Sequence, residues 1–144
     1  MKISTRTRYG IRAIIELAQR QADGPVQLRS ISRHQGISEK YLEQLMTIMK
    51  GAGLIKSVRG AKGGYMLARP ASEVTMDEVF RCLEGHVLIM ECVKDGSSCY
   101  RSSECVARQL WQQLEWAMDK VLKGMTLKDL AERARTSWRP EYEI

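Results

Sequence analysis

Three closely spaced cysteines are the residues of this sequence best suited to chemistry. Cys92, Cys99 and Cys105 lie within fourteen residues and are separated by six and then five residues, around Gly96-Ser97-Ser98. Thiolates are soft ligands for iron–sulfur clusters and for zinc, and a loop followed by a helix can bring three of them together. Disulfides are disfavoured because three is an odd number and no feature indicates an oxidising compartment. The pattern predicts a metal or cluster site, with redox-active or inert thiols as the alternatives.

Three thiolates leave such a site one ligand short. A group from a partner subunit and an exogenous ligand are both open as the fourth ligand. Four residues in or beside the loop are further candidates: Glu84, His86, Glu91 and Glu104. Cys82 differs from the other cysteines, because it shares one side of a predicted helix with Val79 and Leu83, which favours a structural thiol.

Charge is divided unequally along the 144 residues, whose net charge is +6. Residues 1–70 hold 13 Lys and Arg against 4 Asp and Glu, a net +9, whereas residues 71–144 hold 10 against 13, a net −3. A basic half joined to a mildly acidic half suggests a polyanion-binding module coupled to a second function. An ordinary solvated basic face is the alternative.

The segment 31–42 fits a helix, a glycine turn at Gly36 and a second helix that Ser38 caps, as in a helix-turn-helix unit. The apolar stripe of the second helix predicts its buried side: Leu42, Leu45, Met46 and Met49. The remaining positions predict a face for the DNA major groove: Ser38, Lys40, Tyr41, Glu43, Gln44 and Thr47. The alternative is an ordinary solvated helix, because any such helix has a polar face.

A cationic hairpin strengthens the prediction of DNA binding. Residues 54–59 are expected to form a strand, residues 60–64 a turn and residues 65–68 the returning strand. Arg59, Gly60 and Lys62 then form a small, positive wing that can approach the DNA backbone. Four more arginines are candidate phosphate contacts: Arg6, Arg8, Arg12 and Arg33. His34 is expected to be a surface residue.

Helical periodicity organises the rest of the chain. A first helix is expected over 5–21, with Ile11, Ile14, Ile15 and Ala18 on one face, and a short second helix over 28–35. Thr75 and Glu78 form a capping box that begins a helix ending at Leu83. A last short helix is expected to begin at Thr126, with a loosely ordered tail from Trp138.

A long helix over about 104–123 carries a seam with steps of three and four residues: Ala107, Leu110, Leu114, Ala117 and Val121. One small chain cannot easily bury that seam, so we expect a partner helix and a homodimer. The predicted fold class is mainly α with a small β-wing: a winged helix-turn-helix DNA-binding domain over 1–70, a short helix and cysteine loop over 71–104, and a dimerisation helix, short helix and tail over 105–144.

Composition argues against several other classes. The sequence is 44% apolar and 28% charged, as in ordinary globular proteins, and no segment approaches the roughly 20 apolar residues of a membrane helix. The Arg-rich start continues into a helical pattern, so we interpret it as mature protein and expect a cytoplasmic location. No set of nucleophile, base and orienting group is present, so we do not expect an enzyme.

Four motifs together resemble the IscR/NsrR family of bacterial regulators, also called the Rrf2 family. They are the helix that contains Tyr9, the stretch Gly36-Ile37-Ser38 through Tyr41-Leu42-Glu43-Gln44-Leu45, the wing Val58-Arg59-Gly60 with Gly63-Gly64-Tyr65, and the cysteine loop. The resemblance covers nearly the whole chain. The local sequence of these motifs is most similar to that of the IscR branch.

The resemblance implies a DNA-binding transcriptional regulator that acts as a repressor and dimerises through the long helix. It also implies an iron–sulfur cluster on Cys92, Cys99 and Cys105, expected to be 2Fe-2S rather than 4Fe-4S, which controls promoter binding at cluster-assembly genes. Arg108 stands where IscR-like proteins place a histidine, and Arg8 where some nitric-oxide sensors place an acid. A nitric oxide or redox sensor and a zinc-stabilised protein-interaction module are the alternatives.

Overall fold

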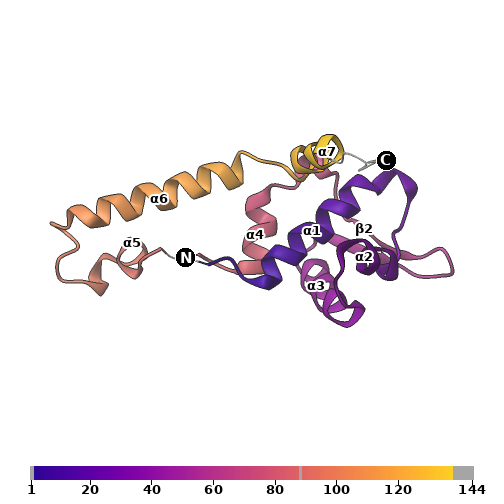
Figure 1. Cartoon of the computed structure of the whole chain (residues 1–144). Coiled ribbons are helices and arrows are strands. Elements are labelled where there is room, and N and C mark those ends of the chain that lie inside the picture. The colour runs from indigo at the N-terminus through magenta and orange to yellow at the C-terminus, as the bar shows by residue number, and fades with distance from the viewer. Residues whose placement is uncertain (1, 88, 138–144) are drawn as a thin grey trace, which may run out of the picture.

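The computed structural model describes residues 2–87 and 89–137; the tail expected from Trp138 lies outside these residues. The described chain is mostly helical and contains one two-stranded antiparallel sheet, which confirms the predicted fold class (Figure 1). None of the helices in residues 2–87 and 89–137 is both long and apolar enough to cross a membrane.

Local signals in the sequence explain where the first elements begin and end. The Ser4 side chain accepts a hydrogen bond from the Thr7 amide, and Ser38 accepts one from the Tyr41 amide, so each caps a helix. Gly36 adopts a φ of 64°, the left-handed conformation that the turn between two helices needs. The elements are α1 (Thr5–Gln19), η1 (Gln21–Asp23), α2 (Leu28–Gln35), α3 (Glu39–Gly51), β1 (Ile55–Val58) and β2 (Gly64–Leu67).

The first helix ends two residues earlier than expected, because the chain tightens into the 3-10 turn η1. Strand β1 is one residue shorter than expected at each end, and β2 begins and ends one residue earlier than expected. The two strands pair in the register Ile55 with Leu67 through Val58 with Gly64. Val26 pairs with Tyr65 through two backbone hydrogen bonds of 2.8 Å, which ties the start of α2 to the wing.

Two later helices complete the core of this winged-helix body. The turn η2 (Ala71–Glu73) leads into α4 (Met76–Glu84), where the predicted capping box of Thr75 and Glu78 is confirmed. The last helix, α7 (Leu127–Ser137), returns to α1 and buries Leu127 and Ala131 there. We call the unit of α1–α4, the wing and α7 the body.

The buried apolar side chains of the body form one cluster from both halves of the sequence: Ala13, Ile14, Leu17, Ala18, Val26, Ile31, Ile37, Leu42, Leu45, Met46, Met49, Leu54, Ile55, Leu67, Val74, Met76, Val79, Leu83, Leu127 and Ala131. Helix α1 approaches α4 closely at Gly10. A Cβ at Gly10 would lie 2.6 Å from the Leu83 side chain, so only glycine permits this packing.

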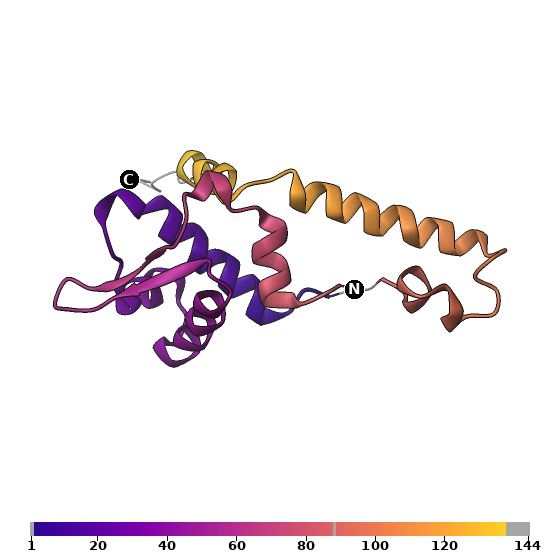
Figure 2. The ribbon, with the colours of Figure 1, turned by 180° about the vertical axis from the view of Figure 1, so that it is seen from behind.

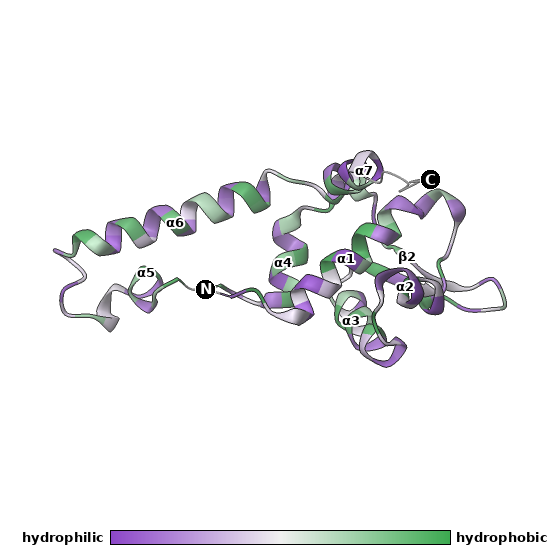
Figure 3. Ribbon diagram, viewed as in Figure 1, coloured by the Kyte–Doolittle hydropathy of each residue, from purple (hydrophilic) through white to green (hydrophobic). Residues whose placement is uncertain are grey.

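The rest of the chain forms an elongated arm that projects from the body (Figures 1 and 2). It consists of α5 (Glu91–Lys94), the 3-10 turn η3 (Gly96–Ser98) and α6 (Val106–Lys123). The cysteine segment therefore contains a short helix where only a loop was expected. Helix α6 has no buried residue, although apolar turns recur along its length (Figure 3).

Candidate nucleic-acid interface and cysteine loop

The second helix of the helix-turn-helix presents the face that was predicted from its periodicity. All four residues of its apolar stripe are buried: Leu42, Leu45, Met46 and Met49. Lys40, Glu43, Gln44 and Thr47 are exposed on the other side. Two of the predicted groove residues also have local partners. Ser38 caps α3, and the Thr47 hydroxyl donates to the Glu43 carbonyl at 2.9 Å.

Tyr41 is half-buried, unlike the other residues of this face. Its ring meets Tyr9 of α1 edge to face, with ring centroids 6.1 Å apart. Such pairs are stabilising beyond the area they bury. Tyr41 therefore joins the recognition helix to α1 while remaining partly accessible at the first turn of α3.

The wing is a tight cationic turn built on glycine. Arg59, Gly60 and Lys62 are all exposed. The Gly63 amide donates to the Gly60 carbonyl at 3.0 Å, and a Cβ at Gly63 would lie 2.1 Å from the Val58 carbonyl oxygen. Glycine is thus required for the turn that presents the two cations.

The wing and the recognition helix are also fastened to each other. Lys50, near the end of α3, donates to the Ser57 hydroxyl of β1 at 2.8 Å. In addition, β1 packs against α3, and Ile55 of β1 and the preceding Leu54 are both buried. The two candidate DNA-contacting elements therefore belong to one body and are expected to move together.

The four arginines predicted to contact phosphates have different surroundings. Arg6 donates through Nε to the Leu83 carbonyl at 2.8 Å, and Arg8 lies 5.2 Å from the centre of the Tyr9 ring. Arg12 donates twice to Gln35, the last residue of α2. Arg33 is exposed on α2. Arg6 and Arg12 thus contact other helices of the body, whereas Arg8 contacts its neighbour Tyr9 within α1.

His34 is largely exposed, as expected, but its Nδ1 lies 3.0 Å from a carboxylate that the sequence analysis missed. That carboxylate belongs to Glu16, which is only 4% exposed. It is also bonded to Arg20 and Gln35. Position 16 of the predicted amphipathic helix carries an acid beside the apolar stripe, and this was the available signal for a buried polar network.

The three clustered cysteines occupy three different local environments in the arm. Cys92 is half-buried in α5, Cys99 is exposed at the end of η3, and Cys105 is the half-buried residue that precedes α6. All are free thiols. Between the first two, Asp95 accepts hydrogen bonds from the Ser97 amide and hydroxyl, which hold the pKa of its carboxyl below the ordinary value.

The donor set is right in kind for a cluster, but it is not assembled. Within residues 2–87 and 89–137, no three His, Cys, Asp or Glu side chains are grouped so that they could hold a metal ion. Two of the four fourth-ligand candidates have other partners: Glu84 is bonded to Ser4 and Thr7, and His86 contacts Arg81 and Glu115. Glu91 and Glu104 are exposed in the arm.

Arg108 replaces the histidine that the family resemblance places there, and it has a structural partner. Its Nε donates to the Cys92 backbone carbonyl at 2.8 Å. This hydrogen bond fastens α5 to the first turns of α6. The side chain therefore holds the first cysteine's backbone beside the helix that follows the third cysteine.

Cys82 lies apart from the arm, as predicted. It is half-buried in α4, and its Sγ lies 3.8 Å from the Ile48 carbonyl oxygen. Burial raises the pKa of the Cys82 thiol, while nearby Arg6 acts in the opposite direction. A raised pKa reduces the thiolate fraction, so this cysteine is poorly suited to ligate a metal.

The predicted seam of α6 is uncovered in the single chain. Leu110, Leu114 and Val121 are 51%, 44% and 60% exposed. An apolar groove of about 400 Å³ adjoins the seam: Ile3, Phe80, Leu114, Ala117, Met118, Val121 and Leu122. Such a large exposed apolar surface marks an interface.

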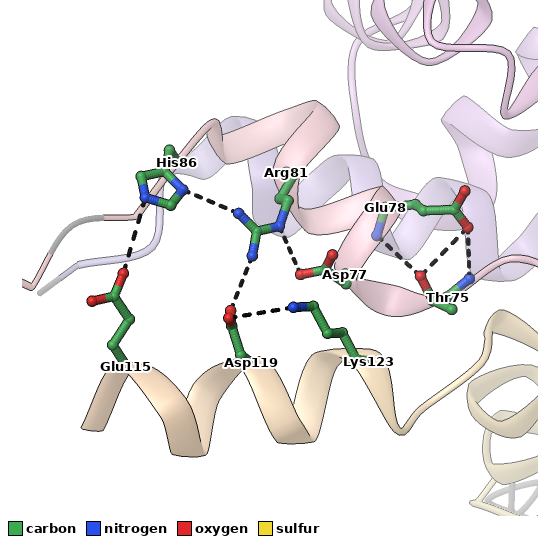
Figure 4. Close-up of polar contacts among 8 residues, drawn as sticks. All are labelled: Thr75, Asp77, Glu78, Arg81, His86, Glu115, Asp119 and Lys123. Carbon is green, nitrogen blue, oxygen red and sulfur yellow. Dashed lines mark hydrogen bonds and ion pairs between the residues drawn. The ribbon is translucent and has the colours of Figure 1, made fainter. Parts of the chain in front are cut away.

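Helix α4 connects the arm to the body through polar contacts (Figure 4). Arg81 contacts Asp77 within α4 at 2.8 Å and Asp119 of α6 at 3.0 Å. His86 lies 3.9 Å from Glu115 of α6. On its other side, α4 holds the beginning of α1, because Glu84 accepts hydrogen bonds from the Ser4 amide and hydroxyl.

Comparison with known proteins agrees with this architecture. Residues 3–133 match the Rrf2 family model, described as an iron-dependent transcriptional regulator. The chain is 42% identical over 131 residues to the HTH-type transcriptional regulator CymR of Bacillus subtilis, covering 91% of this chain and 90% of CymR. It is 35% identical over 130 residues to IscR of Klebsiella pneumoniae, covering 90% of this chain and 79% of IscR.

Solved structures show the same fold. CymR, the global cysteine regulator of B. subtilis, superposes with a TM-score of 0.80 at 40% identity and covers 92% of this chain and 98% of its own. IscR of T. potens gives a TM-score of 0.77 at 36% identity, over 99% of this chain and 95% of its own. Rrf2 regulators bind DNA and act as dimers. This chain belongs to the Rrf2 family of transcriptional regulators.

Proposed function

We propose that this regulator reads a palindromic DNA site with α3 and the wing, and that an iron–sulfur cluster held by Cys92, Cys99 and Cys105 controls its affinity. Its targets would be cluster-assembly genes, which it would repress. The observation that carries the proposal is the division of labour in the chain. A basic body presents the reading face, while the three thiols lie together in sequence on an arm that continues into the dimer helix.

The reading face supplies two kinds of DNA contact. Gln44 can pair in two-pronged fashion with adenine, and Glu43 can accept a hydrogen bond from cytosine, because both side chains are exposed on α3. Arg59 and Lys62 on the wing would neutralise phosphates or enter a narrow minor groove. A two-fold dimer would present two such faces to the two half-sites of a palindrome.

Gel-shift titration over a range of salt concentrations tests this face. Arg59→Ala is expected to weaken binding to every duplex and to lower the slope of log affinity against log salt by about 1. Glu43→Ala is expected to change the preference at one base pair by about 1–3 kcal/mol and to leave the slope unchanged. Unchanged affinities for both variants on every duplex would show that α3 and the wing do not form the DNA-binding face.

The cluster would be held by the thiolates of Cys92, Cys99 and Cys105. When bound, it supplies a group that responds to iron supply and oxidation. Its type is proposed to be 2Fe-2S. Because Arg108 is a permanently charged hydrogen-bond donor and cannot ligate a metal, the fourth ligand would come from an exposed acid such as Glu91 or Glu104, from a partner subunit or from solution.

The chain's own contacts offer a route from the arm to the reading face. Arg81 joins α4 to Asp119 of α6, and the segment after α4 leads directly to Cys92. Glu84 and the Leu83 carbonyl in turn hold the beginning of α1 through Ser4 and Arg6. A change in the order of the cysteine segment would therefore act on α4, and α4 would act on the body.

Anaerobic purification with absorption and electron paramagnetic resonance spectra and with iron, sulfide and zinc analysis tests for the cluster. Iron and sulfide in equal amounts, lost together in Cys92→Ala but retained in Cys82→Ala, are the expected result. Zinc without iron would favour a zinc-stabilised interaction module. Neither metal would favour a redox sensor that acts through bare thiols.

Coupling is tested by comparing the anaerobic holoprotein with Cys92→Ala on a library of duplexes. A coupling free energy of about 1–3 kcal/mol would change DNA affinity roughly 5- to 150-fold on at least one class of duplex. Cys82→Ala is the matched control, because its thiol lies in the body, and it should bind like the unmodified protein. Equal binding by holoprotein and Cys92→Ala on every duplex would exclude the cluster as the switch.

A second candidate is regulation of cysteine metabolism, which the 42% identity to CymR favours. CymR is the global cysteine regulator of B. subtilis. This candidate predicts no iron or sulfide in the purified protein. The same metal analysis therefore separates it from the leading proposal.

A further inference from the structure

Arg12 in α1 closes the end of α2 next to the turn of the helix-turn-helix. Its Nε donates to the side-chain oxygen of Gln35 at 2.9 Å, and its Nη2 donates to the Gln35 backbone carbonyl at 2.8 Å. Gln35 is the last residue of α2, where carbonyls have no partner within the helix. A cation at this end also interacts favourably with the helix dipole. Gly36 follows directly, so Arg12 holds one side of the turn.

The same guanidinium reaches the other side of the turn through two tyrosines. Its Cζ lies 5.5 Å from the centre of the Tyr9 ring, a distance at which a cation is attracted to an aromatic face. Tyr9 meets Tyr41 at an interplanar angle of 85°. Because Tyr41 lies in the first turn of α3, Arg12 contacts α2 directly and α3 through Tyr9.

A buried carboxylate holds the other end of the Gln35 amide. Glu16 Oε2 accepts a hydrogen bond from Gln35 Nε2 at 2.7 Å, while Glu16 Oε1 lies 3.1 Å from Arg20. A carboxylate that is only 4% exposed is tolerated when it is paired and hydrogen-bonded in this way. Arg12, Glu16 and Arg20 are spaced by four residues, so they share one face of α1. The Gln35 side chain is consequently fixed from both sides by α1.

We infer that Arg12 is a positioning residue, which sets the orientation of α2 and α3 relative to α1, and that it does not serve as a phosphate contact of the kind proposed for Arg59. This inference rests on the proposed DNA-reading function, because it concerns the helices that carry the reading face. A phosphate contact would add affinity for every duplex. A positioning residue adds affinity chiefly where α3 must meet base edges in one orientation.

Two substitutions at Arg12 separate these roles on a duplex that the full-length protein selects from a random-sequence library. Arg12→Ala removes the charge and both donors, whereas Arg12→Lys keeps the charge but cannot reproduce the planar, two-pronged arrangement on Gln35. Both variants are expected to bind the selected duplex roughly tenfold more weakly. Binding to an unrelated duplex and the salt slope on that duplex should stay at the unmodified values.

Arg33→Ala is the matched control, because it removes the same charge from an exposed position on α2. Its effect should be equal on the selected and unrelated duplexes. Gln35→Ala completes a double-mutant cycle with Arg12→Ala. The double variant should lose little more than either single variant, because both remove one shared contact. Thermal unfolding checks that the variants fold. If Arg12→Ala does not fold, Arg12→Lys is compared with the unmodified protein on the two duplexes instead.

The inference is overturned if Arg12→Lys binds the selected duplex as tightly as the unmodified protein. It is equally overturned if Arg12→Ala weakens both duplexes to the same extent and lowers the salt slope by about 1, as a lost phosphate contact would. In either case the reading face itself still stands, because the unmodified protein has selected a duplex. If the unmodified protein enriches no duplex, the DNA-reading function fails and this inference fails with it.

Discussion

Apolar side chains are used in opposite ways in the body and in the arm. Leu42, Leu45 and Met46 of α3 are at most 1% exposed, because the other helices of the body cover them. Leu110, Leu114 and Val121 of α6 repeat with similar helical spacing but lie largely in solvent. The body thus completes its own core, whereas the arm depends on something outside the single chain.

The largest expected effect is on dimerisation through the exposed apolar seam of α6. Leu114→Glu places a charge in the seam, and burying an unpaired charge in the dimer is expected to weaken dimerisation at least about 100-fold, or about 3 kcal/mol. Sedimentation velocity should then show a folded monomer, because Leu114 is not part of the body's core.

Gln112→Glu is the matched control, because it adds the same charge on an exposed position on the opposite side of α6. It should remain dimeric. A Leu114→Glu variant that sediments as a well-folded dimer would show that the interface lies elsewhere on the molecule.

An intermediate effect is expected from adding side-chain volume at a glycine in each region. Gly10→Val is expected to reduce the free energy of unfolding by roughly 2 kcal/mol, because the new carbons would meet the buried Leu83 side chain. Gly96→Ala in the arm should change it by less than about 0.5 kcal/mol, since its Cβ would meet only the flexible end of Arg108 at 3.4 Å. Urea denaturation measures both, and equal losses would contradict the distinction between body and arm.

The smallest expected effect concerns Glu84, which lies where the two regions meet. Hydrogen bonds from the hydroxyls of Ser4 and Thr7 hold the pKa of the Glu84 carboxyl below its ordinary value of 4.5. A lowered pKa in the folded state means that the ionised group stabilises the fold above pH 4.5, and that this contribution is lost as the pH falls through the folded pKa. The sign therefore predicts acid destabilisation.

Glu84→Gln is expected to cost up to about 1 kcal/mol near neutral pH, a value limited by solvent screening, and progressively less below pH 4.5. Thermal melts across that pH range of unmodified protein, Glu84→Gln and Glu73→Gln provide the test. Glu73 is exposed, so its variant should follow the unmodified protein. A Glu84→Gln deficit that is independent of pH would contradict the assigned hydrogen bonds to the ionised carboxylate.

The sequence predicted the candidate DNA-binding face in more detail than it predicted the candidate cysteine site. For the DNA face, periodicity identified the buried and exposed sides of α3, since 3.6 residues per turn fix which side chains share a face. For the arm, cysteine spacing identified the candidate ligands but not their arrangement. Cys92 lies in the short helix α5, Cys99 follows η3 and Cys105 precedes α6, and no local rule states how three thiols on such a segment converge.

The sequence by itself determined the features that depend on neighbouring residues: the Ser38 cap, the Gly36 turn, the capping box of Thr75 and Glu78, and the glycine-rich wing. Their partners lie within a few residues, so the signal is local. Only the tertiary structure decided the features whose partners are distant. Arg12 meets Gln35 23 residues away, Arg6 meets Leu83 77 residues away, and Arg135 of α7 meets Gln19 116 residues away. An arginine occupies the same place in the sequence pattern whether it faces a phosphate or another helix. Only the packing of the helices therefore shows that these arginines have partners within the protein.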